Sequence, residues 1–379
     1  MTRKALIFTP VLIVALAALV LGIFQLNHGS PLTHFAASGK DKSLLDFYTQ
    51  AQDAAAGRLQ QQQPATVTFL AFGDISLSRS IAATIQAKKD PLYPFHNIVD
   101  LLKSTDFNFA NLESPFSKSD AFTAKNTLVF NAPKTNVVGL KKYNFAVLNL
   151  ANNHAFDQGK DGVDTTAKVL DDNDLLHMGT GETLDQAWAP AIIEKNGIKI
   201  GFIGASYSSV NDGGKTLNNY VARIEDVDRL KTTTSKLKSL VDFIVVTMHA
   251  GTEYMPKANQ SQIDFAHAAI DAGADIVIGA HPHWVQNKEI YNGKPIYYSL
   301  GNFIFDQDWS EETKKGLALK IVLTKPFSPL SKASALNNSA TASDLQPSGG
   351  VQLPTTTIQS IEEIPLFIKE NCCPSVVEK

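Results

Sequence analysis

The chain has 379 residues, 44% hydrophobic and 19% charged, a balance typical of a globular protein with a sizeable core. Its formal net charge of −3 provides no basic field, so we expect no nucleic-acid partner. The only two cysteines are adjacent, Cys372 and Cys373, which excludes a disulfide framework and a four-thiolate metal site, and we interpret the pair as incidental rather than as a redox device.

The N-terminus carries a long apolar segment. Residues 5–24 contain no charged residue, and about 20 apolar residues suffice for a helix to span the hydrocarbon core of a bilayer. A cleaved signal peptide has a shorter apolar region of roughly 7–15 residues. We therefore expect residues 1–26 to be an uncleaved anchor, with cleavage near the stretch HFAAS as the alternative. Arg3 and Lys4 favour a cytoplasmic N-terminus, so we expect a single-pass protein of the cell membrane with an extracytoplasmic main domain.

Two polar, low-complexity stretches follow. Residues 27–65 are rich in small and polar residues and are expected to be a flexible tether. Residues 326–350 are rich in Ser, Ala, Asn and Pro and are expected to be a flexible surface insertion. Residues 351–379 regain a strand-like pattern, so we expect a C-terminal strand and tail there.

The region between these stretches, residues 66–325, has a regular pattern. Short apolar runs rich in Val, Ile and Phe alternate with helical patterns such as DGVDTTAKVLDDND and QSQIDFAHAAIDAGA. Strands that alternate with helices predict an α/β domain whose strands are largely buried.

Five of the expected strands end in side chains that bind metal ions. VTFLAF runs into Asp74, FNFAN into Glu113, FAVLNL into Asn152, Asn153 and His154, FIVVTM into His249, and DIVIGA into His281 and His283. Because the carboxyl ends of strands in an α/β sheet open onto one crevice, these side chains can converge. Nitrogen and oxygen ligands together suit a divalent cation.

Each of these residues also has an ordinary structural interpretation. Asp74 could cap a turn, Glu113 could be a solvated loop residue, and the asparagines could be turn residues. A lone His249 would more often be a satisfied core histidine than a ligand. However, such residues recur at five strand ends over roughly 200 positions, and one metal site explains them together, so we favour the metal site.

Six motifs occur in order across residues 66–308: FLAFGDISLSRSI, STDFNFANLESPF, YNFAVLNLANNHAFDQGKDGVDTT, VVTMHAGTEY, ADIVIGAHPHWVQ and YYSLGNFIFDQ. They resemble the CapA family of poly-γ-glutamate capsule biosynthesis proteins, a branch of the calcineurin-like metallophosphoesterases. The resemblance implies a four-layer α/β/β/α sandwich of two mixed sheets flanked by helices. It also implies two divalent metal ions at the sheet edge, with Mn, Fe and Zn all admissible.

The resemblance assigns six metal ligands, namely Asp74, Glu113, Asn153, His249, His281 and His283. Glu113 stands where metallophosphoesterases place a bridging Asp. His154 is implied to face the substrate, with Asp157 orienting it from the next turn. Ser76 stands where metallophosphoesterases usually carry a histidine. The CapA branch commonly lacks that histidine, and its absence leaves one metal a ligand short. Arg79 could offer a cation to an anionic substrate group, or it could be an ion-paired arginine.

The implied function is metal-assisted hydrolysis of a phosphoester or related anionic substrate, with a phosphoanhydride or a γ-glutamyl amide also admissible. In this scheme Glu113 bridges the metals and His154 protonates the leaving group or stabilises the developing charge. The alternative is a non-catalytic accessory subunit that binds an anionic polymer or holds a synthesis and export complex together. The expected partners are the cell membrane, the anionic polymer or substrate, and other membrane proteins of a polyglutamate synthesis complex.

Overall fold

The computed structural model describes residues 64–207, 219–327, 355–369 and 372–377, all of which belong to one compact unit. The expected anchor, the tether up to residue 63 and the expected insertion from residue 328 onward lie outside these ranges. No helix in the described ranges combines the length and the apolar character needed to cross a membrane.

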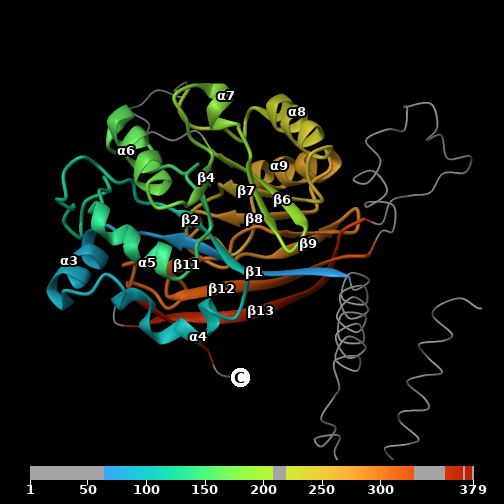
Figure 1. The fold of residues 1–379 in the computed structure, drawn as a ribbon. Helices are drawn as coiled ribbons and strands as arrows, with labels where there is room; N and C mark the ends of the chain where they lie inside the picture. Colours follow the sequence, from blue (N-terminus) through green and yellow to red (C-terminus); the bar gives the residue numbers. More distant parts are fainter. Residues whose placement is uncertain (1–63, 208–218, 328–354, 370–371, 378–379) are drawn as a thin grey trace, which may run out of the picture. The chain divides into compact units, whose positions relative to one another are not determined.

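The larger sheet has eight strands in the described residues, with mixed directions. Figure 1 shows several of them, among them β1, β2, β12 and β13. The strand order is β14-β13-β12-β1-β2-β3-β4, and β11 pairs with β1 beside this path. The strands are β1 (Ala65–Ile75), β2 (Phe107–Leu112), β3 (Val147–Asn149), β4 (Leu176–Met178), β11 (Asn302–Ile304), β12 (Lys315–Lys325), β13 (Thr357–Lys369) and β14 (Cys373–Val376). Strands β1 to β4 run parallel to one another, whereas β12, β13 and β14 pair in antiparallel fashion.

The smaller sheet has six strands in the order β5-β6-β7-β8-β10-β9. The strands are β5 (Ala191–Lys195), β6 (Ile198–Ser206), β7 (Phe243–His249), β8 (Ile276–Ala280), β9 (Lys288–Tyr291) and β10 (Lys294–Tyr297). The inner strands β6, β7, β8 and β10 are parallel, and the edge strands β5 and β9 are antiparallel to their neighbours.

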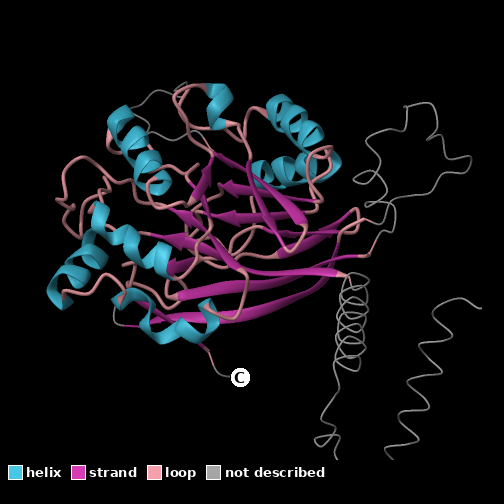
Figure 2. Cartoon of the chain, viewed as in Figure 1, coloured by secondary structure: helices cyan, strands magenta, loops and turns pink. Residues whose placement is uncertain are grey.

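Helices lie outside the strands (Figure 2). They are α3 (Arg79–Lys88), α4 (Val99–Leu102), α5 (Val137–Lys142), α6 (Gly159–Asp171), α7 (Leu184–Ala187), α8 (Val227–Leu237) and α9 (Gln260–Asp271), with 3-10 turns η1 (Tyr93–Ile98) and η2 (Lys134–Asn136). Apolar residues of α3, α5 and α6 form one core with the larger sheet, while α7, α8 and α9 form another with the smaller sheet. The expected α/β class with two mixed sheets and helices is confirmed.

The side chains of β1 explain why its sequence is almost continuously apolar. Val67 and Phe69 enter a core between the two sheets, whereas Leu70 and Phe72 enter the core under the helices. This alternation is the two-residue period of a strand, here with both faces buried. Phe69 stacks on Phe107 of β2 at 5.0 Å between ring centroids, so aromatic rings fill the space between the sheets.

The C-terminal residues complete the larger sheet. Strand β13 pairs antiparallel with β12, and β14 pairs back onto β13. Cys373 begins β14 and Cys372 directly precedes it, and the two are buried and form a disulfide with each other. The pair is thus bonded and packed into the core beside the helices, which its adjacency in the sequence did not predict.

Candidate metal centre

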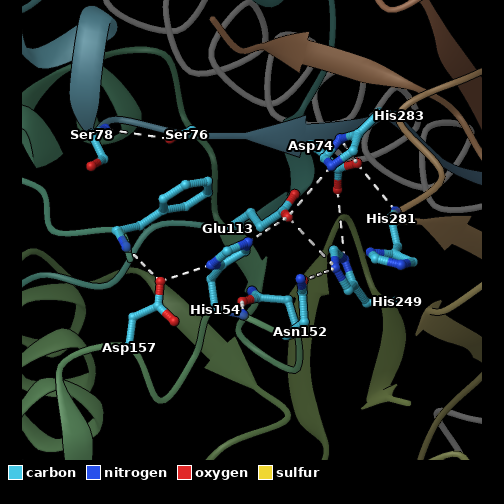
Figure 3. A network of polar contacts seen from close by, with 12 residues as sticks. Asp74, Ser76, Ser78, Glu113, Asn152, His154, Asp157, His249, His281 and His283 are labelled. Atoms are coloured by element: carbon cyan, nitrogen blue, oxygen red, sulfur yellow. Dashed lines mark hydrogen bonds and ion pairs between the residues drawn. The ribbon is translucent and has the colours of Figure 1, made fainter. Parts of the chain in front are cut away.

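The candidate site lies at the carboxyl ends of strands from both sheets (Figure 3). The larger sheet contributes residues from β1 and from the segments after β2 and β3, and the smaller sheet contributes residues from β7 and from the segment after β8. Seven candidates are at most 7% exposed, namely Asp74, Glu113, Asn153, His154, His249, His281 and His283. Polar side chains this deeply buried need partners, and they are brought together here.

A close backbone approach fixes the position of Asp74. A Cβ on Gly73 would lie 1.9 Å from the carbonyl oxygen of Gly301, so only glycine fits there. The backbone N–H of Asp74 donates to the same Gly301 oxygen at 3.1 Å, and Asp74 is in register with Asn302 of β11. The tip of β1 is thereby fixed against β11.

Two groups of three side chains have the spacing of metal ligands. One consists of Glu113, His249 and His281, the other of Asp74, Glu113 and His283. Within each group the potential ligand atoms lie within 4.8 Å of one another. Glu113 belongs to both groups, which is the arrangement expected of a carboxylate that bridges two cations.

The carboxylate of Glu113 is buried without a compensating hydrogen bond in the described structure. It is fully buried, and neither of its oxygens has a hydrogen-bond partner among the described residues. Its Oε1 lies 3.8 Å from Nε2 of His154, 3.8 Å from Nε2 of His249 and 3.9 Å from Nε2 of His283. Figure 3 shows Glu113 among these histidines. Burial, and then the charge of Asp74, raises the pKa of Glu113 well above its usual value. Unpartnered carboxylate oxygens among imidazoles fit a divalent cation.

Burial favours the neutral form of two imidazoles at the candidate centre. Burial lowers the pKa values of His249 and His281 well below the usual histidine value, and neighbouring histidines lower them further. Both rings are therefore neutral at pH 7, and neutral imidazole is the form that ligates metals. Nδ1 of His281 has no hydrogen-bond partner in the described structure, so its buried ring edge is open to a cation.

Two asparagines that sequence reasoning missed orient the candidate ligands. Asn111 donates from Nδ2 to Asp74 Oδ1 at 2.8 Å and lies 3.1 Å from Nδ1 of His249. Asn302 accepts a hydrogen bond from Nδ1 of His283 through Oδ1 at 2.8 Å, which leaves Nε2 of that ring as the lone-pair nitrogen. Asn111 stands two positions before Glu113 on a buried strand, and this spacing could have revealed it.

The two adjacent asparagines of the NLANNH segment after β3 make different contacts. Asn153 Oδ1 lies 2.7 Å from Nε2 of His249, so Asn153 reaches the candidate ligands. Asn152 donates to the carbonyl oxygen of Leu112 and accepts from the N–H of His154. Asn152 thus serves the turn, whereas Asn153 faces the centre.

His154 is held by Asp157. Oδ2 of Asp157 lies 2.7 Å from Nδ1 of His154, so the carboxylate keeps the proton on Nδ1 (Figure 3). The other ring nitrogen, Nε2, is directed toward Glu113. This arrangement leaves one imidazole nitrogen beside the candidate metal centre to transfer a proton.

Arg79 and Ser76 depart from a simple active-site assignment. Arg79 is 8% exposed and forms an ion pair with Asp306, so the ion-paired alternative describes its contacts. Its guanidinium carbon also lies 4.3 Å from the ring centroid of Phe130. Ser76 is buried, and its hydroxyl accepts a weak 3.4 Å bond from the N–H of Ser78. The side chain of Ser76 thus makes a contact within its own loop.

The HPH segment has an unusual backbone. His281 has φ 98° and His283 has φ 57°, in the left-handed region that favours glycine. The N–H of His281 donates to Oδ2 of Asp74 at 3.1 Å, a bond that joins the two sheets. Non-glycine residues held in this conformation are typical of functional positions.

Known proteins resemble this chain in sequence. The model of a family described as "Bacterial capsule synthesis protein PGA_cap" matches residues 68–307. The capsule biosynthesis protein CapA of Bacillus anthracis is 31% identical over 273 residues, which cover 69% of this chain and 66% of that protein. The PGA biosynthesis protein CapA of Bacillus subtilis is 33% identical over 248 residues, or 65% of each chain. The chain thus spans about two thirds of the length of these curated relatives.

A more distant relative is a Mycobacterium tuberculosis protein named "Probable polyglutamine synthesis accessory protein", 27% identical over 251 residues, covering 63% of this chain and 66% of that protein. A solved structure of a 5'-nucleotidase precursor from Thermus thermophilus aligns with a TM-score of 0.43 and 13% identity, over 81% of this chain and 56% of that one. Because the family model matches more than half of the chain, the expected membership is confirmed, and the chain belongs to the bacterial capsule synthesis protein family.

Proposed function

We propose that this protein is a metal-dependent hydrolase of an anionic substrate in capsule polymer biosynthesis. The observation that carries the proposal is Glu113, a fully buried carboxylate that both ligand groups share and that no described hydrogen-bond donor satisfies. A buried, unpaired carboxylate destabilises a fold unless a cation compensates it. The proposal assumes the four-layer α/β/β/α arrangement of the calcineurin-like metallophosphoesterases.

Six residues would hold two divalent cations: Asp74, Glu113, Asn153, His249, His281 and His283. When bound, Mn, Fe or Zn at such a site would neutralise the substrate's negative charge and lower the pKa of water. His154 would donate a proton from Nε2 to the leaving group or stabilise the charge that develops there. Asp157 would keep Nδ1 protonated, so that Nε2 is the nitrogen that acts.

A phosphoester is the substrate class that we favour, because two cations beside a general acid suit phosphoryl chemistry. A phosphoanhydride or a γ-glutamyl amide has the same anionic character. The names of the relatives connect them with capsule, PGA or polyglutamine synthesis, which supports a polymer-related role for this chain. Its partners would then be the anionic polymer and other membrane proteins of a synthesis complex.

A non-catalytic accessory subunit is the second candidate, and the word "accessory" in the name of the Mycobacterium tuberculosis relative favours it. A subunit of this kind would bind anionic polymer or hold a complex together without turnover. The hydrogen-bonded His154 and Asp157 pair favours the hydrolase, because a scaffold has no need for an oriented proton donor.

Metal analysis and turnover together test the proposal. The full chain, purified in detergent, should contain divalent metal and hydrolyse at least one member of a panel of phosphoesters, phosphoanhydrides and poly-γ-glutamate. Glu113→Gln should lose metal and turnover, while the matched surface variant Glu311→Gln should keep both, since that side chain is exposed and, within the described part of the chain, pairs with Lys314 alone. Metal retention without any hydrolysis would favour the accessory subunit. Unchanged metal content in Glu113→Gln would overturn the metal site.

We also propose that residues 5–24 anchor the protein in the cell membrane with the described domain outside. The uncharged apolar stretch behind Arg3 and Lys4 supports this topology. Reporter fusions at residue 66 and at the C-terminus should both report an external location. A cytoplasmic C-terminus would contradict the topology, and a mature chain that starts near residue 38 would make the segment a signal peptide.

A further inference from the structure

The imidazole of His154 is stacked on the ring of Phe130. The ring centroids are 3.8 Å apart and the planes differ by 10°. Phe130 is 3% exposed and lies in residues 117–131, a segment that forms no helix or strand. A phenylalanine in irregular backbone therefore lies directly against the residue to which we assign proton transfer.

One carboxylate oxygen contacts both the ring of His154 and the backbone of Phe130. Oδ2 of Asp157 lies 2.7 Å from Nδ1 of His154 and accepts the backbone N–H of Phe130 at 2.5 Å. Gln158 also donates from Nε2 to the carbonyl oxygen of Phe130 at 2.7 Å. The loop after β3 thus positions the histidine and the phenylalanine together.

Arg79 holds Phe130 from the other side. Its guanidinium carbon lies over the ring, 4.3 Å from the centroid, and one ring face cannot accommodate both this group and His154 at these distances. Arg79 is itself fixed by the ion pair with Asp306 and by a 3.3 Å bond to the carbonyl oxygen of Thr127. A fixed guanidinium on an aromatic face is an attractive and directional contact.

We propose that Phe130 is a positioning residue for His154, and that Arg79 acts through Phe130 and not on the substrate. The hydrogen bond to Asp157 fixes one ring nitrogen but leaves the imidazole free to rotate about that bond. The flat face of Phe130 removes this rotation and keeps Nε2 directed at the centre. This inference rests on the proposed hydrolase function, because only a reacting group needs such control.

The test replaces Phe130 with leucine, which keeps an apolar side chain but removes the ring. The imidazole C–H signals of His154 are observed by NMR in the metal-free full chain with 13C-labelled histidine, and His154→Ala assigns them. In wild type the ring of Phe130 should shift these signals upfield, and in Phe130→Leu they should move downfield. Turnover should fall about 10–100-fold through kcat, with KM and metal content near wild type. Phe130→Tyr, which retains the ring, should restore both readouts.

Phe145→Leu is the matched control, because Phe145 is fully buried in the core beside the helices and has no contact with His154 in the described structure. It should leave the His154 signals in place. Equal losses in both leucine variants, or unchanged His154 signals in Phe130→Leu, would overturn the inference. Arg79→Gln provides a second variant should Phe130→Leu not fold, and unchanged His154 signals in it would overturn the role of Arg79. If wild type shows no turnover, the proposed function fails, but the NMR signals still decide the role of Phe130.

Discussion

At the candidate metal centre the larger sheet ends in the carboxylates of Asp74 and Glu113, whereas the smaller sheet ends in the imidazoles of His249 and His281. The two halves differ in charge as well as in atom type. Glu113 gains a negative charge when it ionises and has no hydrogen-bond donor among the described residues, while burial keeps the imidazoles neutral. Neither half could hold a cation well alone, so the packing of the two sheets is what creates the site.

The largest effect should follow from removing charge on the carboxylate side. Asp74→Asn keeps the shape of the side chain but halves the carboxylate charge that the larger sheet supplies, so metal affinity should fall by at least about 100-fold. Turnover should fall to background. Metal content by mass spectrometry and titration with Zn²⁺ would measure the change. Asp161→Asn is the matched control, since Asp161 is exposed and pairs with Lys118; an equal effect in both variants would refute a special role for Asp74.

The next effect should distinguish a proton donor from a metal ligand at the end of the larger sheet, and it concerns His154. His154→Ala should reduce turnover by about 10²–10⁴-fold, the usual size of a lost general acid, because Nε2 of that ring is removed. Metal content should stay near wild type. His96→Ala, at a half-exposed histidine of η1, should leave both measurements unchanged. Substantial metal loss in His154→Ala would instead make His154 a ligand.

A smaller effect on metal affinity should come from Asn302, the hydrogen-bond partner of His283, whose imidazole belongs to the segment after β8 of the smaller sheet. Asn302→Ala removes the acceptor that fixes Nδ1 of His283, so the ring loses its orientation. Metal affinity should fall about 10–100-fold, while the fold is retained. Asn173→Ala, which removes the hydrogen bond from Nδ2 to the carbonyl oxygen of Val169, is the control. Metal binding as tight as wild type in Asn302→Ala would show that His283 needs no such support.

The smallest effect concerns the stability of metal-free protein. Because the pKa of Glu113 is raised in the folded state, folding is favoured while Glu113 is protonated, and this contribution is lost as pH rises from about 4.5 through the folded pKa. Glu113→Gln cannot ionise, so its advantage in Tm over wild type should grow with pH in that window. Each unit of pKa shift corresponds to about 1.4 kcal/mol.

The lowered pKa values of His249 and His281 act in the opposite direction, since their stabilisation is present above about 6.5 and is lost as pH falls. Comparison of the variant with wild type at each pH cancels this contribution. Thermal unfolding after chelator treatment would measure the difference. A Tm advantage that shrinks as pH rises would contradict the raised pKa of Glu113.

Strand ends were predictable from sequence because buried parallel strands are continuous apolar runs, and the polar residue that ends such a run is visible. The α/β class and the convergence of Asp74, Glu113 and His249 followed from that pattern. Asn302 and Phe130 were missed, because their roles depend on which segments pack together. Asn302 matters only because β11 lies beside β1, and no local pattern encodes that pairing.

Arg79 illustrates the same difficulty from another side. Arg79 stands in the same motif as Asp74, and the sequence allowed either substrate binding or an ion pair for it. Its partner, Asp306, is 227 positions away along the chain, so the ion pair emerges only from the tertiary structure. The disulfide between Cys372 and Cys373 likewise could not be read from their adjacency, because exposed and buried pairs look alike in a sequence.

The left-handed backbone of His281 and His283 makes these positions a point where stability and function compete. Each non-glycine residue in such a conformation costs on the order of 1–3 kcal/mol, and glycine would remove much of that cost. Selection for stability alone would thus drive both positions toward glycine. If the rings of His281 and His283 bind metal as proposed, His→Gly at either position should raise stability while it removes the proposed ligand, so the two properties should change in opposite directions.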